Sequence, residues 1–593
     1  MRDFRGDTIY FVMVDRFCDG DPTNDHGRDP SDCDPTRKDY WKYWGGDLRG
    51  VIQRLDYIQS VGANAVWLTP VFDQIDLPLE IGGVKMAPYH GYWTKDFKRL
   101  DEHLVDRPED QRVFAREDTV FDELVAAMHA RGMKLVLDIV CNHSNPHIPG
   151  APCELYDDGV LVCAYDADAG GWYHHEGGVE DWGNPSEVQR KDLCGLADFD
   201  EESFAFRSYI KGAMKQWLDK GVDAFRVDTV KHMPIWFWQE FTGDIEVHKP
   251  DTFMFGEWFQ GGAWDPASVE FTNKSGMSIL DFSLRNAVVA ALASRSAAGF
   301  RDVAAVVDRD HLFRDATELV TFVDNHDLPR FLSISDDPAR FRLALLLTMV
   351  ARGVPCLYYG GEQLLHCDEG GGNDPFNRPM MTSFEETPLV RDLALLAALR
   401  RRSPAVQRAG MRTKWLDPEA WVFTRPYLGS TVVVAVNRTD EVRAIEVGDL
   451  EIADGDHADL LGGPALVVRG GRSTLALAPR SIAVFEDTRP LPVGATSIDV
   501  QVHGFETRPG ERLLLCGDAP ELGGWDLARA VPMEWIDRAT WATTVAFDAS
   551  TGLDVHYKFV VDRGGRLERE PGRGHHRRVR ASGCATWRDE WRE

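Results

Sequence analysis

Three acidic side chains lie at the ends of apolar runs, where such residues are rare unless they are paired or take part in chemistry. They are Asp228, Glu257 and Asp327. Arg226 precedes Asp228 by two residues, so in a strand both side chains share one face, and the guanidinium favours the ionised acid. A retaining glycosidase needs an ionised carboxylate about 5 Å from a protonated one, to attack the anomeric carbon and to release the leaving oxygen. Asp228 is therefore the candidate nucleophile; the alternative is three unrelated structural ion pairs.

Eight near-continuous apolar runs could position these acids. Helical patterns separate the runs, and this alternation indicates a parallel sheet covered on both faces. Eight such units predict a (β/α)8 TIM barrel, whose chemistry lies at the carboxyl ends of its strands. Asp138, Asn142 and His143 fall at one such end. The predicted strands are 8–17, 64–72, 134–143, 224–230, 252–258, 278–284, 319–327 and 355–362.

Two helix patterns between the strands carry boundary signals. The segment 48–62 ends at Gly62, and the segment 119–132 begins with Thr119 and acidic residues and ends at Gly132. Such boundaries support the alternation of strand and helix that a barrel requires.

The chain is too long for a single hydrophobic core, so we expect several domains. A segment of about 60 residues, rich in Gly, Asp and aromatic side chains, follows the third strand, where a barrel loop needs only a few. After Pro404 short β runs replace the alternation, and PLPVG (490–494) has the composition of a linker. We predict an α/β fold: a TIM barrel with an inserted subdomain after the third strand, followed by two β-sandwich domains. The boundaries are 1–143 and 203–403 for the barrel, 144–202 for the insertion, 404–489 for the first sandwich and 495–593 for the second.

The formal charge of the chain is -29, from 66 basic and 95 acidic residues. This excess argues against nucleic acid or an anionic membrane as a partner and favours a neutral substrate, although solubility alone would also explain it. No apolar run approaches the roughly 20 residues of a membrane span. We therefore expect no nucleic acid and no membrane among the partners.

The ten cysteines contain no C-x-x-C pair, so a zinc site of that kind is not expected. Cys18 with Cys33, and Cys153 with Cys163, lie in loop-like segments and could form disulfides, whereas Cys141 and Cys356 lie in apolar runs that favour core thiols. The chain enters its first strand without a basic and then apolar leader, so either a signal was removed or the protein stays inside the cell.

Five motifs resemble those of the alpha-amylase family, glycoside hydrolase family thirteen, and within it the cyclodextrin glucanotransferases and maltogenic amylases. The likeness covers roughly residues 7 to 490. It implies that Asp228 is the nucleophile, Glu257 the general acid and base, and Asp327 the group that stabilises the transition state. The motifs are DIVCNH (138–143), LADFD (196–200), GVDAFRVDTVKH (221–232), FGEWF (255–259) and FVDNHD (322–327).

The residue types near these motifs suit sugar binding, and the resemblance extends the set. His143 and His326 suit hydrogen bonds to sugar hydroxyls, and Tyr92 suits stacking on an apolar sugar face. By resemblance, Lys231, His232 and Phe259 belong to the acceptor side, and Asp374 and Arg378 form a donor-side pair. The full predicted substrate-binding set is His90, Tyr92, His143, Trp182, Arg226, Lys231, His232, Phe259, His326, Asp374 and Arg378.

The segment DGDPTND (19–25) concentrates carboxylate and amide oxygens in one turn. Such a density of oxygen ligands suits a hard cation, although Asp and Asn also favour turns through local hydrogen bonds. The resemblance implies two calcium ions, the second of which would tie the insertion to the barrel. The first would be held by Asp19, Asp21, Asn24, Asp25, the Gly45 carbonyl and Asp47, and the second by Asn142, Asp198 and the carbonyls of Gln189 and His232.

The last unit resembles a starch-binding domain, carbohydrate-binding module family twenty. Trp525 and Lys558 match one sugar-binding site of that family, and Trp535 lies close to an aromatic position of the other. Arg569 and Pro509 replace two further expected aromatic residues, so binding should be weaker. The alternative is that Trp525 belongs to the core, since Trp is usually largely buried.

Two departures from the glucanotransferases favour an endo-acting alpha-amylase that produces linear maltooligosaccharides from internal α-1,4-glucosidic bonds of starch. The linker leaves no room for their extra immunoglobulin-like domain, and Cys194 stands where they place a Tyr or Phe. A cyclodextrin glucanotransferase is the alternative, and a non-catalytic starch-binding protein is a third hypothesis that the three intact acids oppose. Starch and other α-1,4-glucans are thus the expected partners of a monomer. A polymeric substrate favours an extracellular enzyme, with the cytoplasm as the alternative.

Overall fold

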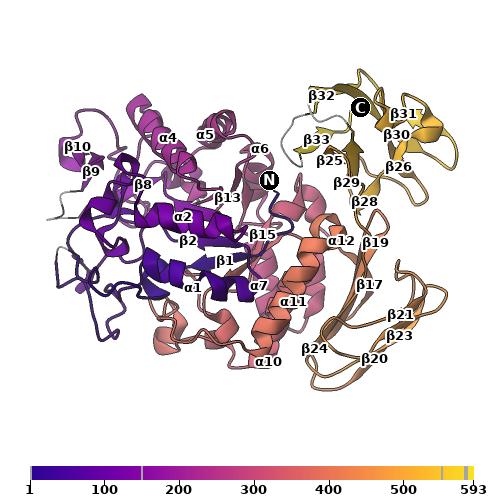
Figure 1. The fold of residues 1–593 in the computed structure, drawn as a ribbon, viewed down its shortest axis with the longest axis horizontal. Coiled ribbons are helices and arrows are strands. Elements are labelled where there is room, and N and C mark those ends of the chain that lie inside the picture. The colour runs from indigo at the N-terminus through magenta and orange to yellow at the C-terminus, as the bar shows by residue number, and fades with distance from the viewer. Residues whose placement is uncertain are drawn as a thin grey trace.

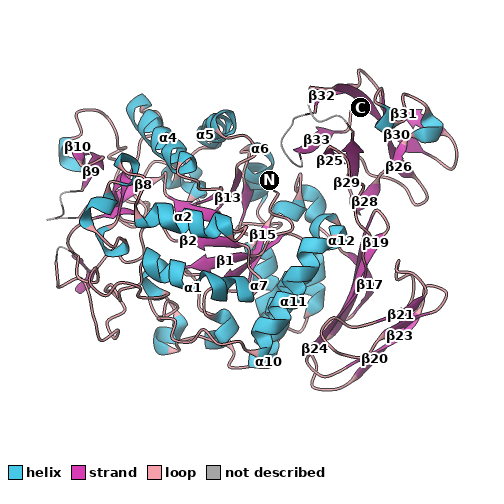
Figure 2. Ribbon diagram, in the orientation of Figure 1, coloured by secondary structure: helices cyan, strands magenta, loops and turns pink. Residues whose placement is uncertain are grey.

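The computed structural model describes residues 3–27, 29–148, 151, 153–548, 552–579 and 585–592. Eight parallel strands form a barrel in the order β14-β13-β12-β7-β2-β1-β16-β15. A bridge between Leu280 and Val320 joins the two end strands, so the barrel nearly closes and the predicted fold class is confirmed (Figures 1 and 2). The barrel strands are β1 Ile9–Val12, β2 Ala65–Leu68, β7 Lys134–Ile139, β12 Ala224–Val227, β13 Phe253–Gly256, β14 Ser278–Ile279, β15 Val320–Phe322 and β16 Val354–Tyr358.

Each predicted run contains one barrel strand, but the strands are shorter than the runs. β12 ends at Val227 and β13 at Gly256, so the next residues already belong to loops at the carboxyl end. In the run 278–284 the strand ends at Ile279, and Phe282 begins a helix. The apolar periodicity continues into these loops because their residues are buried as well, and sequence alone cannot mark where the hydrogen-bonded ladder stops.

Helices cover the outside of the barrel and begin and end where the sequence signals lie (Figure 2). Asp47 caps α1 by accepting a hydrogen bond from the Gly50 amide, and Thr119 forms a capping box with Asp122 at the start of α2. The helices of this region are α1 Leu48–Ser60, α2 Val120–Ala130, α4 Phe204–Asp219, α5 Ile235–His248, α6 Pro266–Lys274, α7 Phe282–Leu292, α8 Phe300–Val307, α9 Phe331–Ile334, α10 Pro338–Val350, α11 Pro388–Arg402 and α12 Pro404–Arg408.

The subdomain beside the barrel draws on more of the chain than the predicted insertion 144–202. Its four-stranded sheet has the order β10-β9-β6-β3, and β6 and β3 come from the loop that follows the second barrel strand. Sequence reasoning missed this contribution, because a pairing between distant segments leaves no local pattern. The elements are β3 Phe72–Gln74, β4 Leu79–Ile81, β5 Val84–Met86, β6 Thr94–Leu100, β8 His143–Pro146, β9 Glu154–Asp157, β10 Val160–Ala164, α3 Pro185–Val188 and β11 Leu196–Asp198.

Two all-β units follow the barrel, each with its own buried apolar cluster. The first contains β17 Arg412–Leu416, β18 Ala420–Tyr427, β19 Ser430–Asn437, β20 Arg443–Val447, β21 Gly455–His457, β22 Leu466–Val468, β23 Ser473–Leu477 and β24 Ser481–Asp487. The second, which we call the terminal unit, contains β25 Thr496–His503, β26 Arg512–Gly517, β27 Val531–Pro532, β28 Glu534–Asp537, β29 Thr540–Phe547, β30 Asp554–Asp562, β31 Leu567–Arg569, β32 His575–Arg578 and β33 Ala585–Glu590.

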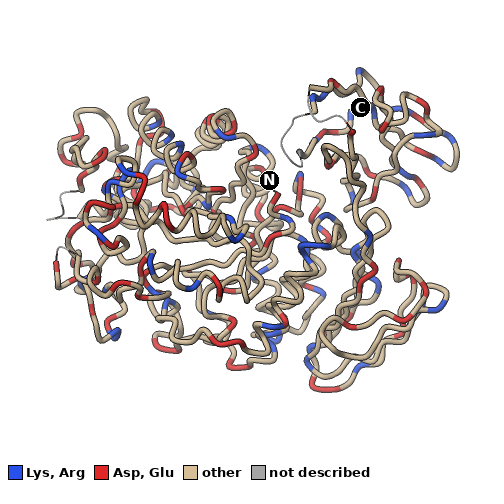
Figure 3. The backbone as a smooth tube through the Cα atoms, viewed as in Figure 1, with Lys and Arg blue, Asp and Glu red and all other residues tan. Residues whose placement is uncertain are grey.

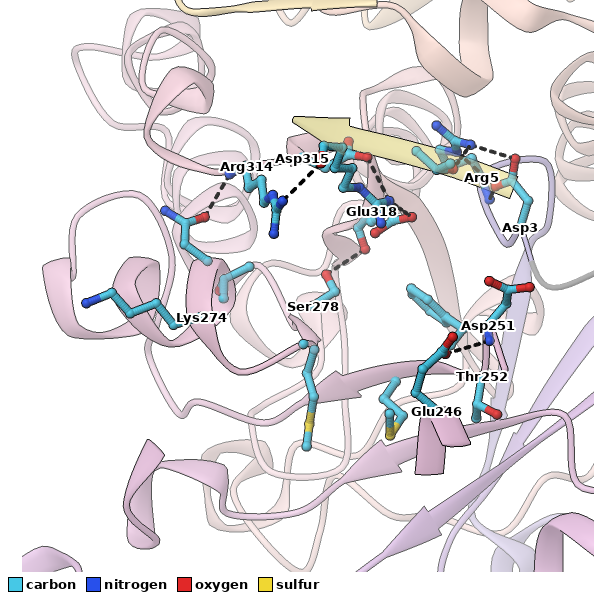
Figure 4. A pocket seen from close by; sticks show the side chains of 18 residues that line it. Asp3, Arg5, Glu246, Asp251, Thr252, Lys274, Ser278, Arg314, Asp315 and Glu318 are labelled. Carbon is cyan, nitrogen blue, oxygen red and sulfur yellow. Dashed lines mark hydrogen bonds and ion pairs between the residues drawn. The ribbon is translucent and has the colours of Figure 1, made fainter. Parts of the chain in front are cut away.

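The terminal unit docks against the amino end of the barrel, opposite to the end where the predicted catalytic acids lie. A cavity of about 460 Å³ remains at this junction, and it is lined by residues at the starts of β13 and β14 and by Thr586 and Arg588 of β33. Figure 4 shows charged side chains on several sides of it, among them Arg5, Asp315 and Glu318. We call the ion pairs around this cavity the docking network.

Lys and Arg are interspersed with Asp and Glu along all parts of the chain in the view of Figure 3. Among the described residues, no helix is both long and apolar enough to cross a bilayer. The thiols of Cys18, Cys33, Cys153 and Cys163 are not joined to one another, so neither suggested disulfide is formed. Cys141 and Cys356 are fully enclosed, as expected of core thiols.

Candidate active site

The three predicted catalytic acids come together at the carboxyl end of the barrel. Asp228 directly follows β12, Glu257 directly follows β13, and Asp327 lies in the loop after β15. Glu257 is the middle member, because its side chain is within hydrogen-bonding reach of both Asp228 and Asp327. Asp228 and Glu257 are buried, whereas Asp327 is partly exposed.

One guanidinium joins these acids at the base of the site. Arg226 Nη1 donates hydrogen bonds to Asp228 Oδ1 at 2.8 Å and to Asp138 Oδ1 at 2.9 Å. Its Nη2 lies 3.0 Å from Glu257 Oε2, yet it forms no hydrogen bond there. Arg226 therefore contacts both Asp228, the proposed nucleophile, and Glu257, the proposed acid. It forms a hydrogen bond with Asp228 and none with Glu257, and this difference favours the ionised form of Asp228.

Asp138 is the residue whose place in this network the sequence did not reveal. It is fully buried in β7, and its Oδ2 accepts hydrogen bonds from the Trp67 indole at 3.0 Å and from the Tyr92 hydroxyl at 2.8 Å. The motif DIVCNH includes Asp138, but Trp67 carried no signal beyond its place in an apolar run. Asp138 thus shares Arg226 Nη1 with Asp228 and is itself held in place by Trp67 and Tyr92.

The electrostatics of the pair follow from burial and from the shared arginine. Burial raises the pKa of Asp228 and of Glu257 to about 7, against the opposing effect of Arg226. Since Glu257 touches both neighbouring carboxylates, a single proton on it relieves repulsion at two contacts, whereas a proton on Asp228 would relieve one. The proton therefore belongs on Glu257, and Asp228 keeps its charge beside Arg226.

Three histidines around the acids are held neutral. Burial lowers the pKa of His143 to about 3 and places the pKa values of His90 and His326 well below the ordinary range. Both ring nitrogens of His143 and Nδ1 of His326 are buried without a hydrogen-bond partner. Because an unpaired buried polar atom is costly, these nitrogens are suited to a polar ligand. Tyr92 stacks on His326 with ring centroids 5.4 Å apart, so an aromatic ring lies beside the unpaired nitrogen of His326.

Of the predicted acceptor-side residues, Lys231 lines a second cavity of about 420 Å³ together with Trp182 and Gln189, whereas His232 and Phe259 are not among its lining residues. Trp182 is 53% exposed and lies edge-on to His232, with 6.2 Å between the ring centroids. Phe259 is 47% exposed on the loop after β13. Large aromatic side chains this exposed are suited to covering a ligand.

The predicted donor-side pair is formed. Arg378 Nη1 lies 2.7 Å from Asp374 Oδ1, and Arg378 Nη2 lies 3.5 Å from Asp327 Oδ1. The Arg378 Nε also donates to the His326 carbonyl at 2.9 Å. Arg378 therefore links Asp374 to the catalytic loop, in addition to any contact with a ligand.

The oxygen-rich turn fits a hard cation. Asp19 Oδ1, Asn24 Oδ1 and Asp25 Oδ1 are all buried without a hydrogen-bond partner. Burial and the charge of Asp19 raise the pKa of Asp25 to about 6, as expected where carboxylates gather at one place. Gly45 has φ 89°, and a β carbon there would collide with Asp25, so its backbone approaches the turn closely. Asp47 caps α1 and also accepts from the Asp21 amide at 2.8 Å, and the Thr23 hydroxyl donates to Asp21 Oδ1 at 2.6 Å.

The second predicted cation position also leaves oxygens unpaired. Asn142 Oδ1 and Asp198 Oδ1 are buried without partners, and the Phe199 amide donates to the Asn142 carbonyl at 2.9 Å. His232 Nδ1 lies 3.0 Å from the Val188 carbonyl, which brings its backbone next to Gln189. The four predicted ligands thus come from segments that the fold holds together.

The terminal unit places its three predicted sugar-binding residues differently. Trp525 is 36% exposed, and the Arg569 guanidinium lies 5.8 Å from its ring centroid. Lys558 Nζ donates to the carbonyls of Glu570 and Gly572. Trp535 differs from the prediction, because Arg412 of the first sandwich lies 5.1 Å from its ring and donates to its carbonyl at 2.6 Å. Trp535 is half-buried against the core of the terminal unit and takes part in a contact between units, so it offers a smaller platform for a sugar than Trp525 does.

Cys194 is exposed and has φ 53°, in the left-handed region, and Gly195 follows with φ 81°. A tight turn of small residues therefore stands beside the LAD motif. This part of the cleft carries no aromatic ring at that position.

Comparison with known families and proteins agrees with this geometry. Residues 11–393 match the model of the alpha amylase catalytic domain, and residues 495–589 match that of the starch binding domain. A cyclomaltodextrin glucanotransferase of Klebsiella oxytoca is 33% identical over 94% of this chain and 89% of its own length. Another from Niallia circulans is 35% identical, with 78% of this chain and 63% of the relative covered.

Solved structures show the same pattern. CldA, described as the first cyclomaltodextrin glucanotransferase with a three-domain ABC distribution, is 35% identical with a TM-score of 0.76, covering 82% of this chain and 99% of its own. An Anoxybacillus alpha-amylase is 29% identical with a TM-score of 0.70, covering 83% of this chain and all of its own (100%). Both kinds of enzyme therefore share this fold.

Proposed function

The chain belongs to the alpha-amylase family, and we propose that within it the chain is a retaining enzyme that cleaves α-1,4-glucosidic bonds of starch and transfers the glycosyl group, as a cyclodextrin glucanotransferase does. The observation that carries this choice is the match to the Klebsiella oxytoca glucanotransferase over 94% of this chain. It replaces the endo-acting hydrolase that the sequence analysis favoured.

The first half of the reaction uses the carboxyl end of the barrel. Asp228 attacks the anomeric carbon with a carboxylate oxygen, and the bond from that carbon to the glycosidic oxygen breaks. Glu257 gives its proton to the departing oxygen, for which its raised pKa near 7 keeps it ready. Asp327, on the other side of Glu257, offers negative charge to the positive sugar that develops between these steps.

The second half of the reaction decides between transfer and hydrolysis. Glu257, now ionised, takes a proton from the incoming hydroxyl, whose oxygen bonds to the anomeric carbon and releases Asp228. A sugar hydroxyl as acceptor gives transfer, and water gives hydrolysis. The exposed aromatic surfaces of Trp182 and Phe259 favour a sugar there, because they offer apolar platforms and displace water.

The remaining site residues position the substrate. The neutral rings of His143 and His326, with unpaired nitrogens, suit hydrogen bonds to sugar hydroxyls, and Tyr92 suits stacking. Arg226 and Asp138 position Asp228. Asp374 and Arg378 are proposed to hold the donor chain, since they lie beyond Asp327 on the same side.

Calcium, when bound, supplies charge that holds oxygen-rich loops together. We propose that Asp19, Asp21, Asn24, Asp25, the Gly45 carbonyl and Asp47 hold one ion, and Asn142, Asp198 and the Gln189 and His232 carbonyls another. The unpaired buried oxygens at both positions support this. The second set joins the subdomain to the loop after β12, which carries Asp228, and so these residues shape the cleft.

A hydrolase that releases linear maltooligosaccharides is the second candidate, and Cys194 favours it. Cyclisation requires the glucan to curl back to the intermediate on Asp228, and a small side chain at this position guides that curl less well than a ring. The short linker, which leaves no room for an immunoglobulin-like domain, does not distinguish a hydrolase from a transferase. CldA is described as a glucanotransferase with a three-domain distribution.

Counting reducing ends separates the two candidates. Hydrolysis creates one new reducing end for every bond cleaved, whereas transfer and cyclisation create none. We expect soluble starch to lose its iodine-staining polymer with far fewer reducing ends than bonds cleaved, and chromatography at early times to show cyclic products. One reducing end per bond, with linear products throughout, would establish the hydrolase instead.

Cys194→Tyr sharpens this test, with Cys194→Ser as a control of similar size to the native residue. The tyrosine variant should shift the ratio further toward cyclic products, though weakly, because the turn around Gly195 does not brace a ring. The serine variant should keep the wild-type ratio.

A further inference from the structure

A second group of ligand-type side chains lies outside the catalytic cleft and outside both proposed calcium positions. It consists of His174, in the loop between β10 and α3, and of Asp200 and Glu201, between β11 and α4. The two segments belong to the subdomain and to the stretch that leads into a barrel helix. Neither the catalytic reaction nor the starch-binding unit uses these residues.

The three donor atoms converge on one point. His174 Nε2 lies 3.2 Å from Glu201 Oε2 and 3.5 Å from Asp200 Oδ1, and the donor atoms all lie within 4.8 Å of one another. The His174 ring is 2% exposed, and the Glu201 side chain is 6% exposed. Despite their closeness, His174 Nε2 and Glu201 Oε2 are both buried atoms without a hydrogen-bond partner. The two atoms thus meet as an ion pair without hydrogen-bond geometry, and both can serve as ligands to a metal ion.

The separations match the coordination of a small divalent ion. Bonds of about 2.0 to 2.1 Å in tetrahedral geometry place neighbouring ligand atoms roughly 3.3 Å apart. The distances of 3.2 and 3.5 Å from His174 Nε2 agree with that spacing. Calcium, with bonds of about 2.3 to 2.6 Å to six or more oxygens, suits this set less well, because one donor is nitrogen.

The other nitrogen of the same ring is already oriented. His174 Nδ1 lies 2.7 Å from Asp198 Oδ2. A metal-bound histidine usually donates its second N–H to a carboxylate in this way, which fixes the tautomer and directs the free nitrogen to the metal. We propose that His174, Asp200 and Glu201 bind a divalent transition-metal ion of the zinc class, with solvent as the fourth ligand.

The position gives such an ion a structural effect. It would join the loop of His174 to the start of α4, and it would act on Asp198, whose other oxygen is proposed for calcium. Occupation of the site should therefore stabilise the subdomain against local opening.

An ion pair without metal is the competing explanation. Burial opposes protonation of His174, but Asp198 and Glu201 outweigh it and raise its pKa to about 10. A metal ion would take the place of that proton. The experiment must therefore detect binding itself.

Zinc titration of the full chain by calorimetry, in a large excess of calcium, tests the proposal. The excess occupies oxygen sites, so the expected result is one equivalent of zinc that calcium does not displace. Cobalt in place of zinc should give the strong visible absorption of a tetrahedral site. No zinc binding under these conditions would overturn the proposal and leave the ion pair.

Matched variants locate the ion. Glu201→Gln and His174→Gln should weaken zinc binding by at least roughly 100-fold, since even the loss of an outer partner of a metal ligand costs 10 to 100-fold. Their exposed or partly exposed neighbours supply the controls, because Glu202→Gln and His175→Gln should retain wild-type affinity. Asp200→Asn, at a side chain 30% exposed, should lose zinc while the fold and the melting temperature in calcium stay unchanged. Equal zinc binding by Glu201→Gln and Glu202→Gln would place the ion elsewhere and end the proposal.

Discussion

The two ends of the barrel hold buried clusters of the same residue types, arginine with carboxylates, in opposite electrostatic states. At the carboxyl end Arg226 alone contacts Asp138, Asp228 and Glu257. At the amino end the docking network has three guanidinium groups for four carboxylates. Arg5 and Arg408 both contact Asp3 and Asp499, and Arg588 contacts Asp315 and Glu318.

The ratio of charges decides the protonation of each cluster. Burial raises the pKa of Asp228 and Glu257, because one guanidinium cannot compensate all its neighbours. Burial acts in the same direction on Asp3, yet Arg5 and Arg408 overcome it and hold the pKa of Asp3 well below its usual range. Where guanidinium groups are too few for the carboxylates around them, the acids can exchange protons. Where the two numbers are nearly equal, the ion pairs form a fixed contact between domains.

The largest expected effect is on turnover. Glu257→Gln or Asp228→Asn should lower kcat by at least about 10³, because the first removes acid catalysis and the second the covalent step. Turnover of starch is measured beside the melting temperature. The assignment of catalysis to Asp228 and Glu257 is wrong if either variant keeps more than a tenth of wild-type activity.

Asp499→Asn should act on the other cluster. Asp499 accepts from Arg5 at 2.6 Å and from Arg408 at 2.8 Å, so the variant leaves these two buried cations with only the Asp3 carboxylate to share and costs about 3 kcal/mol. Urea unfolding should show this loss, while kcat on a short soluble maltooligosaccharide stays near the wild-type value. Glu506→Gln is the control, since its pair with Arg538 is exposed and should contribute less than about 1 kcal/mol. A fall in kcat without a fall in stability would show that the amino-end cluster acts on catalysis instead of on stability.

Calcium should stabilise the carboxyl end of the barrel, where both proposed ions lie, and should not act on the docking network. A chelator is expected to lower the melting temperature and added calcium to restore it, because an ion that binds only the folded state stabilises it by mass action. Asp25→Asn and Asn142→Ala should reduce the response. An unchanged melting curve in excess chelator, together with a protein that contains no calcium, would remove both sites.

The pH dependence of stability should differ in sign between the catalytic pair and Asp3 of the docking network. Unfolded carboxyl groups titrate near about 4, whereas burial raises the pKa of Asp228 and of Glu257 to about 7, so the folded pair gives up its shared proton, from Glu257, near that pH. Their contribution to the free energy of unfolding is therefore present below about pH 4 and is lost as the pH rises through 7. For Asp3, with a lowered pKa, the contribution is present above about pH 4 and is lost as the pH falls.

Melting temperatures of the wild type and Glu257→Gln between pH 4.5 and 8 check this sign. The variant should gain on the wild type as the pH rises, because it lacks the acid that loses its proton. A difference that stays constant over this range would show that Glu257 does not titrate there.

The smallest effect concerns the docked unit. Trp525→Ala should reduce adsorption to granular starch while cleavage of a short soluble substrate stays nearly intact, since an exposed ring contributes by stacking and by raising the local concentration of substrate. Trp535→Ala should leave adsorption unchanged, because Arg412 covers that ring. If the two variants behave alike, the assignment of Trp525 as the exposed platform is wrong.

The barrel could be predicted from the amino-acid sequence, because strand and helix periodicity and caps such as Thr119 depend on residues that are neighbours in the chain. The sequence also placed Asp228, Glu257 and Asp327 at one end, since parallel strands bring their carboxyl ends together. The two β units could also be predicted, because closely spaced short apolar runs replace the alternation of strand and helix patterns.

The contacts between distant groups, in contrast, became visible only in the folded chain. It joined Arg226 to Glu257 as well as to Asp228, added β3 and β6 to the subdomain, and covered Trp535 with Arg412. It also brought His174 to Glu201 and built the docking network. The physical reason is that such contacts depend on how loops and domains pack, and a pairing between remote segments leaves no periodic trace in either of them.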